Sequence, residues 1–443
     1  MNQGWRFNID PYLKLYDKNK NLHTIKTRFY RVTNESISDS TQDNSSAVLY
    51  ADYQFQHKWS KGTAITAGAT AIRNIATSAL FGDHYANNFA VYGQFDKRFF
   101  DKLDLTGGIR LEYYDQDGIR GDSDYYFGQD STVKIPVFPI LRVGAHYQVA
   151  KYSHFRASFG QGVRYPSVAE RYTKTALGDL NVFPNPGLIP ETGWAAEVGF
   201  KQAVKIGKKW KGLIDVAGFI NQYNNMMEFQ FGVFDPRDNA RLDPNGASYD
   251  SIVGHLLLNE GFTVTDLFGF SAVNAESARI TGAEISFNSQ GEIGDVQLTS
   301  LLGYTYMNPI SLNADSAYRS TFSDTTTNML KYRFNHMVKA DIEATWKGIS
   351  LGFSVRYNSY MTNIDQIFLD EIVNGIYILP GLADYRERFS RGDLVFDARV
   401  GYSFAKHYRV GFVVNNVFNR EYVTRPGDVQ APRNFVLQLQ MKF

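Results

Sequence analysis

The last stretch of the chain, Arg433-Asn434-Phe435-Val436-Leu437-Gln438-Leu439-Gln440-Met441-Lys442-Phe443, alternates between apolar and polar side chains, with Val436 as the exception. A period of two is typical of a β-strand whose side chains point alternately to opposite faces. One face of this strand is aliphatic and aromatic, and the other carries amides and an ammonium group. A soluble sheet has little reason to end in this way, whereas a strand that separates lipid from an aqueous lumen does.

The same alternation recurs along the whole chain. In residues 349–358, Ile, Leu, Phe, Val and Tyr alternate with Ser, Gly, Ser, Arg and Asn. The pattern predicts strands at 5–16, 20–33, 46–58, 62–72, 84–98, 103–114, 137–149, 152–160, 190–205, 210–232, 268–289, 294–307, 333–346, 349–358, 394–404, 406–418 and 433–443. Most of these seventeen segments reach the ~9–11 residues that a tilted strand needs to cross a bilayer. No comparable window shows the 3.6-residue period of a helix.

The connections between these segments alternate in length. Short turns are predicted at 17–19, 60–61, 100–101, 150–151, 206–208, 290–292, 347–348 and 405, and long polar loops at about 34–45, 73–83, 117–136, 161–189, 233–267, 308–332, 360–393 and 419–432. Short periplasmic turns and long extracellular loops are typical of outer-membrane barrels. The sequence therefore predicts an all-β fold, a transmembrane antiparallel β-barrel that occupies residues 1–443.

The odd number of predicted strands indicates that this barrel is part of a larger one. If Phe443 ends in the periplasm, an odd count makes strand 5–16 begin at the extracellular rim, whereas barrels with an even count have both termini on one side. We therefore expect upstream strands to be missing. A sheet with two free edges in lipid leaves backbone groups unpaired, at several kcal/mol each. The chain is then expected to need an upstream segment or a partner chain that completes the ring.

Composition excludes several other classes of protein. The 443 residues contain 46 basic and 45 acidic side chains, so the electrostatic footprint of a nucleic-acid-binding protein is absent. There is no cysteine, which excludes disulfides, thiolate metal sites and thiol nucleophiles. No run of 18 apolar residues predicts a transmembrane helix. The start, Met1-Asn2-Gln3-Gly4-Trp5-Arg6, does not have the pattern of a signal peptide.

Four segments, in order along the chain, carry a family resemblance. Residues 156–170 read R-A-S-F-G-Q-G-V-R-Y-P-S-V-A-E, and residues 185–191 read N-P-G-L-I-P-E, followed by E-V-G-F-K at 197–201. Residues 274–284 read N-A-E-S-A-R-I-T-G-A-E, and residues 415–422 read N-N-V-F-N-R-E-Y. Together with the terminal phenylalanine, this series resembles the barrel of TonB-dependent outer-membrane receptors, particularly those of Bacteroidota.

The resemblance implies a 22-stranded barrel with a plugged lumen in the outer membrane of a Gram-negative cell. It implies a receptor that takes up a scarce solute, such as an iron–siderophore complex, haem, cobalamin or an oligosaccharide. The implied partners are outer-membrane lipid, a plug domain with the missing N-terminal strands, the TonB–ExbB–ExbD complex acting through that plug, and a small-molecule ligand. The plug and its TonB box have no counterpart in residues 1–443. The alternatives are a passive porin-like channel or structural barrel, and a soluble β-rich lectin or enzyme.

Five charged residues are predicted to line the lumen, because their apolar neighbours take the opposite face. They are Arg110, Glu112, Arg156, Glu197 and Glu284. A charge is tolerated on that face, whereas Lys or Arg at mid-bilayer on the lipid face costs about 2–4 kcal/mol. We expect a network of ion pairs in the wall, which in a complete receptor also faces the plug. Direct contact with a substrate is the alternative.

A second group lies where strand 152–160 enters the loop 161–189. It consists of Arg164, Tyr165, Glu170, Arg171 and Tyr172. Arg and Tyr at a barrel mouth bind carboxylate, catecholate or sugar ligands through paired hydrogen bonds and ring stacking. The alternative role for the same residues is packing of the loop base.

No metal, cofactor or catalytic site is predicted. Asp115-Gln116-Asp117-Gly118, with Asp122 and Asp124, is a cluster of oxygen ligands predicted in an outer loop. It lacks the EF-hand spacing, so we interpret it as a solvated loop, with calcium binding as the alternative. The eight histidines are scattered. The Gly-x-Ser-x-Gly elbow, the phosphate loop and HExxH are all absent from the sequence. The sequence thus gives no indication of an enzyme.

Overall fold

The computed structural model describes residues 2–37, 43–59, 62–117, 119–120, 125–127, 133–135, 137–177, 180–243, 246–373, 375–405 and 407–442. Almost all regular structure in them is antiparallel β-strand, as the sequence predicts, and the connections hold short helices that it does not predict. The chain forms two compact units. Unit 1 comprises 1–144, 159–194 and 223–277, and unit 2 comprises 145–158, 195–222 and 278–443.

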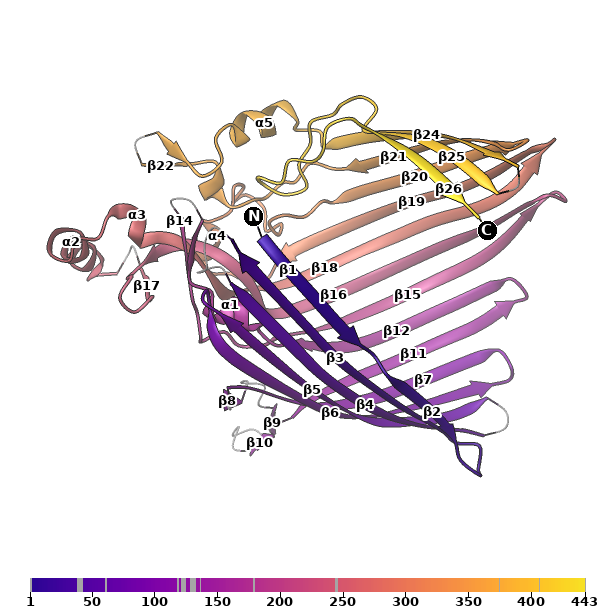
Figure 1. Ribbon diagram of the computed structural model, residues 1–443, viewed down its shortest axis with the longest axis horizontal. Coiled ribbons are helices and arrows are strands. Elements are labelled where there is room, and N and C mark those ends of the chain that lie inside the picture. The colour runs from indigo at the N-terminus through magenta and orange to yellow at the C-terminus, as the bar shows by residue number, and fades with distance from the viewer. Residues whose placement is uncertain are drawn as a thin grey trace. The chain divides into compact units, whose positions relative to one another are not determined.

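Unit 1 opens with a meander of long strands, which lie side by side in Figure 1. They are β1 (Asn2–Ile9), β2 (Tyr12–Tyr16), β3 (Leu22–Ser36), β4 (Asn44–Trp59), β5 (Thr63–Ser78), β6 (Gly82–Phe99) and β7 (Leu103–Gln116). Both β1 and β2 pair with β3. Pro11 lies in the gap between β1 and β2, and proline has no N–H with which to continue a ladder.

Five strands contribute residues to both units. They are β11 (Phe138–Ala150), β12 (Ser153–Arg164), β15 (Glu191–Ile206), β16 (Trp210–Phe234) and β18 (Phe268–Ile293). Connections in unit 1 hold β8 (Ile119–Arg120), β9 (Tyr125–Phe127), β10 (Val133–Ile135), α1 (Val168–Tyr172), β13 (Thr175–Leu177), β14 (Leu180–Phe183), β17 (Arg241–Leu242), α2 (Tyr249–Asn259) and α3 (Val264–Leu267). Helix α2 lies in a loop for which the sequence predicts no helix. It forms because Leu256 is fully buried against Val233, Leu242 and Leu267.

Within unit 2, neighbouring strands also follow one another along the chain as an antiparallel meander. Its further strands are β19 (Val296–Ser311), β20 (His336–Trp346), β21 (Ile349–Asn358), β24 (Asp393–Phe404), β25 (Tyr408–Asn415) and β26 (Asn434–Met441). Its connections hold α4 (Ser316–Arg319), a 3-10 turn at Gln366–Phe368, β22 (Glu371–Val373), β23 (Ile376–Tyr377) and α5 (Leu382–Arg388). The β20–β21 turn is tight because Lys347 and Gly348 both have positive φ, as a two-residue hairpin turn requires.

The predicted strands agree with the long strands of the structure. Counting β1 and β2 as one, the described residues contain seventeen long strands, and most bounds agree within a few residues. Two predicted connections are wrong. The loop at 73–83 is short, because β5 continues to Ser78 and pairs there with Gly82, so only residues 79–81 connect it to β6. The polar residues Arg73, Asn74 and Thr77 indicate a loop, yet they continue the ladder. The turn predicted at 290–292 is part of β18, which pairs with β19 as far as Ile293 and Val296, so the turn lies at 294–295. The predicted turn at 60–61 and terminal Phe443 lie outside the described residues.

The aliphatic rows of the strands are exposed and do not form an internal core. On β21, Leu351 is 58% exposed and Phe353 is 46% exposed. Near the short turns, Tyr16, Trp59, Phe100 and Trp346 are also exposed. Buried apolar clusters occur instead among the connections, around α2 in unit 1 and around α5 in unit 2. None of the helices in the described residues is long and apolar enough to cross a membrane.

Candidate functional site: a charged wall and a loop base

An arginine on β12 anchors an ion-pair cluster in unit 2. The Arg156 guanidinium donates to Glu197 at 2.8 Å and to Asp215 at 2.6 Å, and Lys201 lies 3.2 Å from Asp215. These residues come from β12, β15 and β16. Arg156 reaches Asp215 by crossing β15 at Gly199, where a Cβ atom would lie 2.5 Å from the guanidinium carbon. The absence of a side chain at this position therefore makes the cluster possible.

The same arrangement recurs on β20, β21 and β24. Arg399 donates to Glu343 at 2.8 Å and to Asp341 at 2.7 and 2.8 Å. It crosses β21 at Gly352, where a Cβ atom would lie 2.3 Å from its Nε. Ser354 on the crossed strand also donates to Asp341. Sequence reasoning missed this cluster, although Arg399 and Glu343 lie on the polar rows of their strands.

Unit 1 has its own polar network on the face opposite its exposed apolar rows. Arg110 donates to Glu112 on the same strand at 2.8 Å, and Asn88 donates to that carboxylate at 2.7 Å. Nearby on β4, the buried Asp52 accepts a hydrogen bond from Thr70 at 2.9 Å. Ion pairs and hydrogen bonds of this kind satisfy charges that face a lumen.

Glu284 stands apart from these clusters. It is exposed on β18, and Thr305 donates to it at a long 3.5 Å. The structure thus places Arg156 with Glu197 and Arg110 with Glu112, and it places Glu284 with neither pair.

Arg164, the last residue of β12, holds the start of the following loop. It forms a two-bond pair with Glu191 at 2.7 and 2.9 Å, and it also donates to Glu170 at 2.8 Å. Glu170 closes a capping box on α1, in which the Ser167 backbone N–H donates to the carboxylate and Ser167 Oγ accepts from the Glu170 N–H. The guanidinium of Arg164 is therefore engaged by the carboxylates of both Glu170 and Glu191.

The electrostatics of Glu170 follow from these contacts. Burial raises the pKa of this carboxyl, but the hydrogen bonds from Ser167 and the Arg164 guanidinium together outweigh burial. The pKa of Glu170 is therefore held below its ordinary value, and the side chain is ionised at neutral pH.

The other three residues at the mouth pack the base of the loop. Tyr165 stacks on Tyr114 with ring centres 4.1 Å apart. Arg171 is buried and donates to the carbonyl of Leu188 at 2.6 Å. Tyr172 stacks on His84 at 3.9 Å. These contacts favour the packing role for the group, and ligand binding by it stays a prediction.

Two asparagines of the family-like segments tie this loop to the sheet. Asn274 on β18 donates to the carbonyls of Ile189 and Asn225 and accepts from the Ile189 N–H. Asn185 donates to the carbonyl of Ala272 at 2.9 Å. These roles explain two residues that the sequence singles out only by resemblance.

The described part of the chain contains no group of three or more His, Asp or Glu side chains that could hold a metal ion. The predicted loop position of Asp115 and Gln116 is wrong, because both are buried at the end of β7. Asp117 follows them and accepts from the Tyr85 N–H and bonds to His84. Gly118, Asp122 and Asp124 lie outside the described residues.

A sheet with exposed apolar rows on one face and ion-paired charges on the other is the wall of a transmembrane β-barrel of the outer-membrane type. The family model for the TonB dependent receptor-like β-barrel matches residues 2–417, so the chain belongs to the TonB-dependent receptor family. Members of this family are receptors and transporters of the outer membrane.

Solved structures of low sequence identity share the fold. The ferric-catecholate import receptor Fiu from E. coli K12 is 17% identical, with a TM-score of 0.62. The matched region covers 100% of this chain and 64% of the Fiu chain. The siderophore receptor PirA from Pseudomonas aeruginosa is 13% identical, with a TM-score of 0.63 and the same coverage. The Serratia marcescens hemophore receptor HasR, solved with its hemophore HasA and heme, is 14% identical, with a TM-score of 0.62. The matched region covers 100% of this chain and 66% of the HasR chain.

The chain spans less than two thirds of the length of these solved chains. No curated protein matches its sequence.

Proposed function

We propose that this chain forms the barrel wall of an outer-membrane receptor that takes up a scarce solute with energy supplied through TonB. The observation that carries the proposal is the family match over residues 2–417, on a sheet with one apolar exposed face. The solute is a small molecule of the kind that diffusion supplies too slowly, such as a metal chelate, haem, cobalamin or an oligosaccharide. Fiu is a ferric-catecholate import receptor, PirA is a siderophore receptor, and HasR was solved with its hemophore and heme, and this series favours an iron-containing solute.

The charged clusters support a wall that holds its shape while solute passes. Arg156 and Arg399 each bridge three strands, and each meets two carboxylates. Since the clusters are internally paired, they stiffen the wall and leave little net charge to trap an ionic solute. In the complete receptor we propose that this face also contacts a plug domain, on which TonB acts.

The loop base at Arg164 supports a mouth whose outer loops are anchored. Arg164, Glu170 and Glu191 fix the point at which the loop leaves the sheet. We propose that the ligand is captured by the loops beyond this base, and that Tyr165, Arg171 and Tyr172 act mainly by holding those loops in place.

The test is uptake by cells of the source organism, with the gene present or deleted, and with tonB intact or deleted. The probes are iron-55 supplied as ferric tris-catecholate, haem, cobalt-57 cobalamin and a maltooligosaccharide. We expect at least one probe to accumulate only when both genes are present. If none depends on the gene, the proposal is overturned. If uptake depends on the gene but proceeds equally without TonB, the barrel is a passive channel and energised transport is rejected.

A further inference from the structure

Small side chains lie together on the exposed apolar face of unit 1. In cross-strand register, Tyr53, Ala69 and Val91 form one row, and Ala51, Ala71 and Phe89 form the next. The three alanines leave a depression between the larger side chains that flank them. This depression is a consequence of the sequence, because alanine occurs where neighbouring strands carry aromatic and branched residues.

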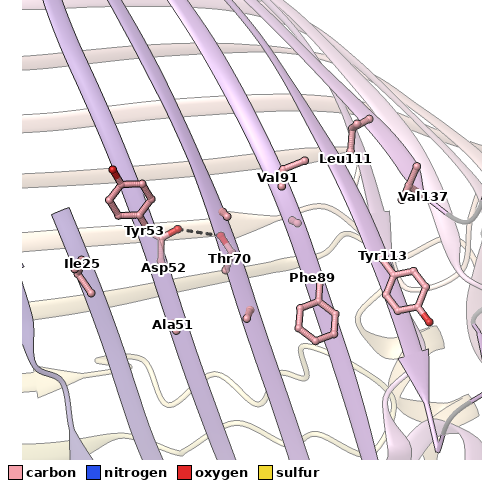
Figure 2. Close-up of a pocket in the computed structure, with 13 residues that line it drawn as sticks. Ile25, Ala51, Asp52, Tyr53, Thr70, Phe89, Val91, Leu111, Tyr113 and Val137 are labelled. Atoms are coloured by element: carbon pink, nitrogen blue, oxygen red, sulfur yellow. Dashed lines mark hydrogen bonds between the residues drawn. The ribbon is translucent and has the colours of Figure 1, made fainter. Parts of the chain in front are cut away.

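The depression is a groove of about 580 Å³ (Figure 2). Ile25 and Tyr53 border it on one side, and Phe89, Val91 and Leu111 on the other. It continues into a second groove of about 500 Å³ that shares Ala51, Ala71 and Phe89 with the first. Asp52 and Thr70 also border the first groove, but by strand alternation their side chains belong to the opposite face, where they are buried and hydrogen-bonded to each other, so the surface open to a ligand is almost entirely apolar.

A polar row crosses the sheet at one end of the groove. Arg73 on β5 pairs in register with Asn87 on β6, which pairs with Asp115 on β7. The Asn87 amide donates to the Asp115 carboxylate at 3.0 Å, and Asp115 is buried. Arg73 is exposed, lies 4.8 Å from the ring of Tyr85, and has no carboxylate partner among the described residues. Within the described residues, its positive charge at the edge of the apolar surface is therefore not balanced by a carboxylate.

We propose that this groove and Arg73 form a binding site for one anionic membrane lipid, with an acyl chain over the three alanines and the phosphate headgroup on the guanidinium. The charge pattern selects this occupant, because an apolar groove that ends at an arginine without a carboxylate partner among the described residues matches an amphiphile with one anionic end. Arginine binds phosphate through paired hydrogen bonds, and basic pockets beside apolar membrane surfaces bind phosphate headgroups. A second protein chain has no comparable reason to place an anion at this point.

The site gives Arg73 a role that its position otherwise lacks. A cation on the lipid-facing side of a barrel is unfavourable, and the cost falls toward the interface. A bound phosphate compensates the charge there. The inference rests on the proposed placement of unit 1 in a membrane, but not on TonB or on any transported solute, so the two proposals fail separately.

The test measures lipid binding to the full-length protein, extracted from membranes in a mild detergent, by native mass spectrometry. The probes are dimyristoyl phosphatidylglycerol and dimyristoyl phosphatidylcholine, which have the same acyl chains. Arg73→Gln removes the headgroup contact, and Ala71→Leu fills the groove. The matched controls are Arg31→Gln and Ala47→Leu, which make the same changes on β3 and β4 at residues outside both grooves.

We expect the native protein to prefer phosphatidylglycerol, and Arg73→Gln to weaken its binding roughly fivefold, the effect of about one cationic contact. Ala71→Leu should reduce binding of both lipids, and the two controls should leave it unchanged. Equal binding of both lipids by the native protein would overturn the headgroup assignment. Equal effects of Arg73→Gln and Arg31→Gln, or no effect of Ala71→Leu, would overturn the site. Unchanged heat-modifiable migration of each variant verifies its folding.

Discussion

At the scale of single residues, the ion-pair clusters of the barrel wall depend on two glycines, Gly199 and Gly352. Arg156 and Arg399 each cross a neighbouring strand to reach a carboxylate two strands away, and each crosses at a glycine. Since a Cβ atom at Gly199 would overlap the guanidinium of Arg156, an alanine there must displace the arginine from Asp215.

We therefore predict that Gly199→Ala lowers the free energy of unfolding by about 1–3 kcal/mol, the usual cost of overpacking. The matched control is Gly303→Ala on β19, where the nearest atom to an added Cβ is 3.9 Å away, and where alanine should be neutral or slightly stabilising. Urea unfolding in detergent, followed by heat-modifiable migration, measures both variants. Equal stability of the two variants would show that the crossing of Arg156 over Gly199 contributes little.

The short helix α1 shows how an element at the mouth depends on charge. Its capping box uses the carboxylate of Glu170, whose pKa in the folded protein is below its ordinary value. A carboxyl with a lowered pKa stabilises the fold fully above its unfolded pKa, and this contribution is lost as the pH falls through the folded pKa.

We predict that α1 opens more readily below about pH 4.5 and that Glu170→Gln removes this pH dependence. Glutamine can still accept from the Ser167 N–H, but it loses the charge that Arg164 and the helix start stabilise. Since a helix cap is worth about 1 kcal/mol, amide exchange of residues 168–173, corrected for its intrinsic pH dependence, should rise in the variant at pH 7 by up to roughly fivefold. Asp384→Asn, in the first turn of α5, serves as the control. If exchange at 168–173 has the same pH profile in the native protein and in Glu170→Gln, the capping carboxylate is not what holds α1.

The strands were predictable because each encodes its two faces in its own alternation. Residues 349–358 need no distant information to identify them, and β21 has these bounds. The failures have a different physical cause. In residues 73–78, polar side chains such as Arg73, Asn74 and Thr77 occur on both faces of β5, so the alternation is broken although the ladder continues to Ser78.

The site was predictable only in part, because its partners come from distant strands. Parity placed Arg156 and Glu197 on one face, but it did not reveal that Arg156 also meets Asp215, or that Arg399 meets Asp341 and Glu343. A guanidinium that crosses a strand depends on the register of three strands, and no local pattern carries that information. The resemblance identified Asn274, while its three hydrogen bonds came only from the structure.

At the scale of the whole molecule, the central question is what surrounds the exposed apolar rows. Two adjacent leucines of β19 allow a direct comparison. Leu302 is 38% exposed and pairs with Ala340 on the aliphatic face, whereas Leu301 is 44% exposed and pairs with Asp341 on the charged face. In water, arginine at either position would change stability by less than about 0.5 kcal/mol. In a membrane, the cost of arginine differs between the lipid-facing position 302 and the lumen-facing position 301.

We predict that Leu302→Arg destabilises the barrel by about 2–4 kcal/mol, the cost of arginine at the bilayer midplane on the lipid face. Leu301→Arg should cost far less, because its side chain enters an aqueous space beside the carboxylates of β20. Unfolding of the full-length protein in lipid bilayers by urea measures both, since the substitutions are identical and the positions are neighbours. If both variants are as stable as the native protein, water surrounds both faces, and the transmembrane placement of this sheet is wrong.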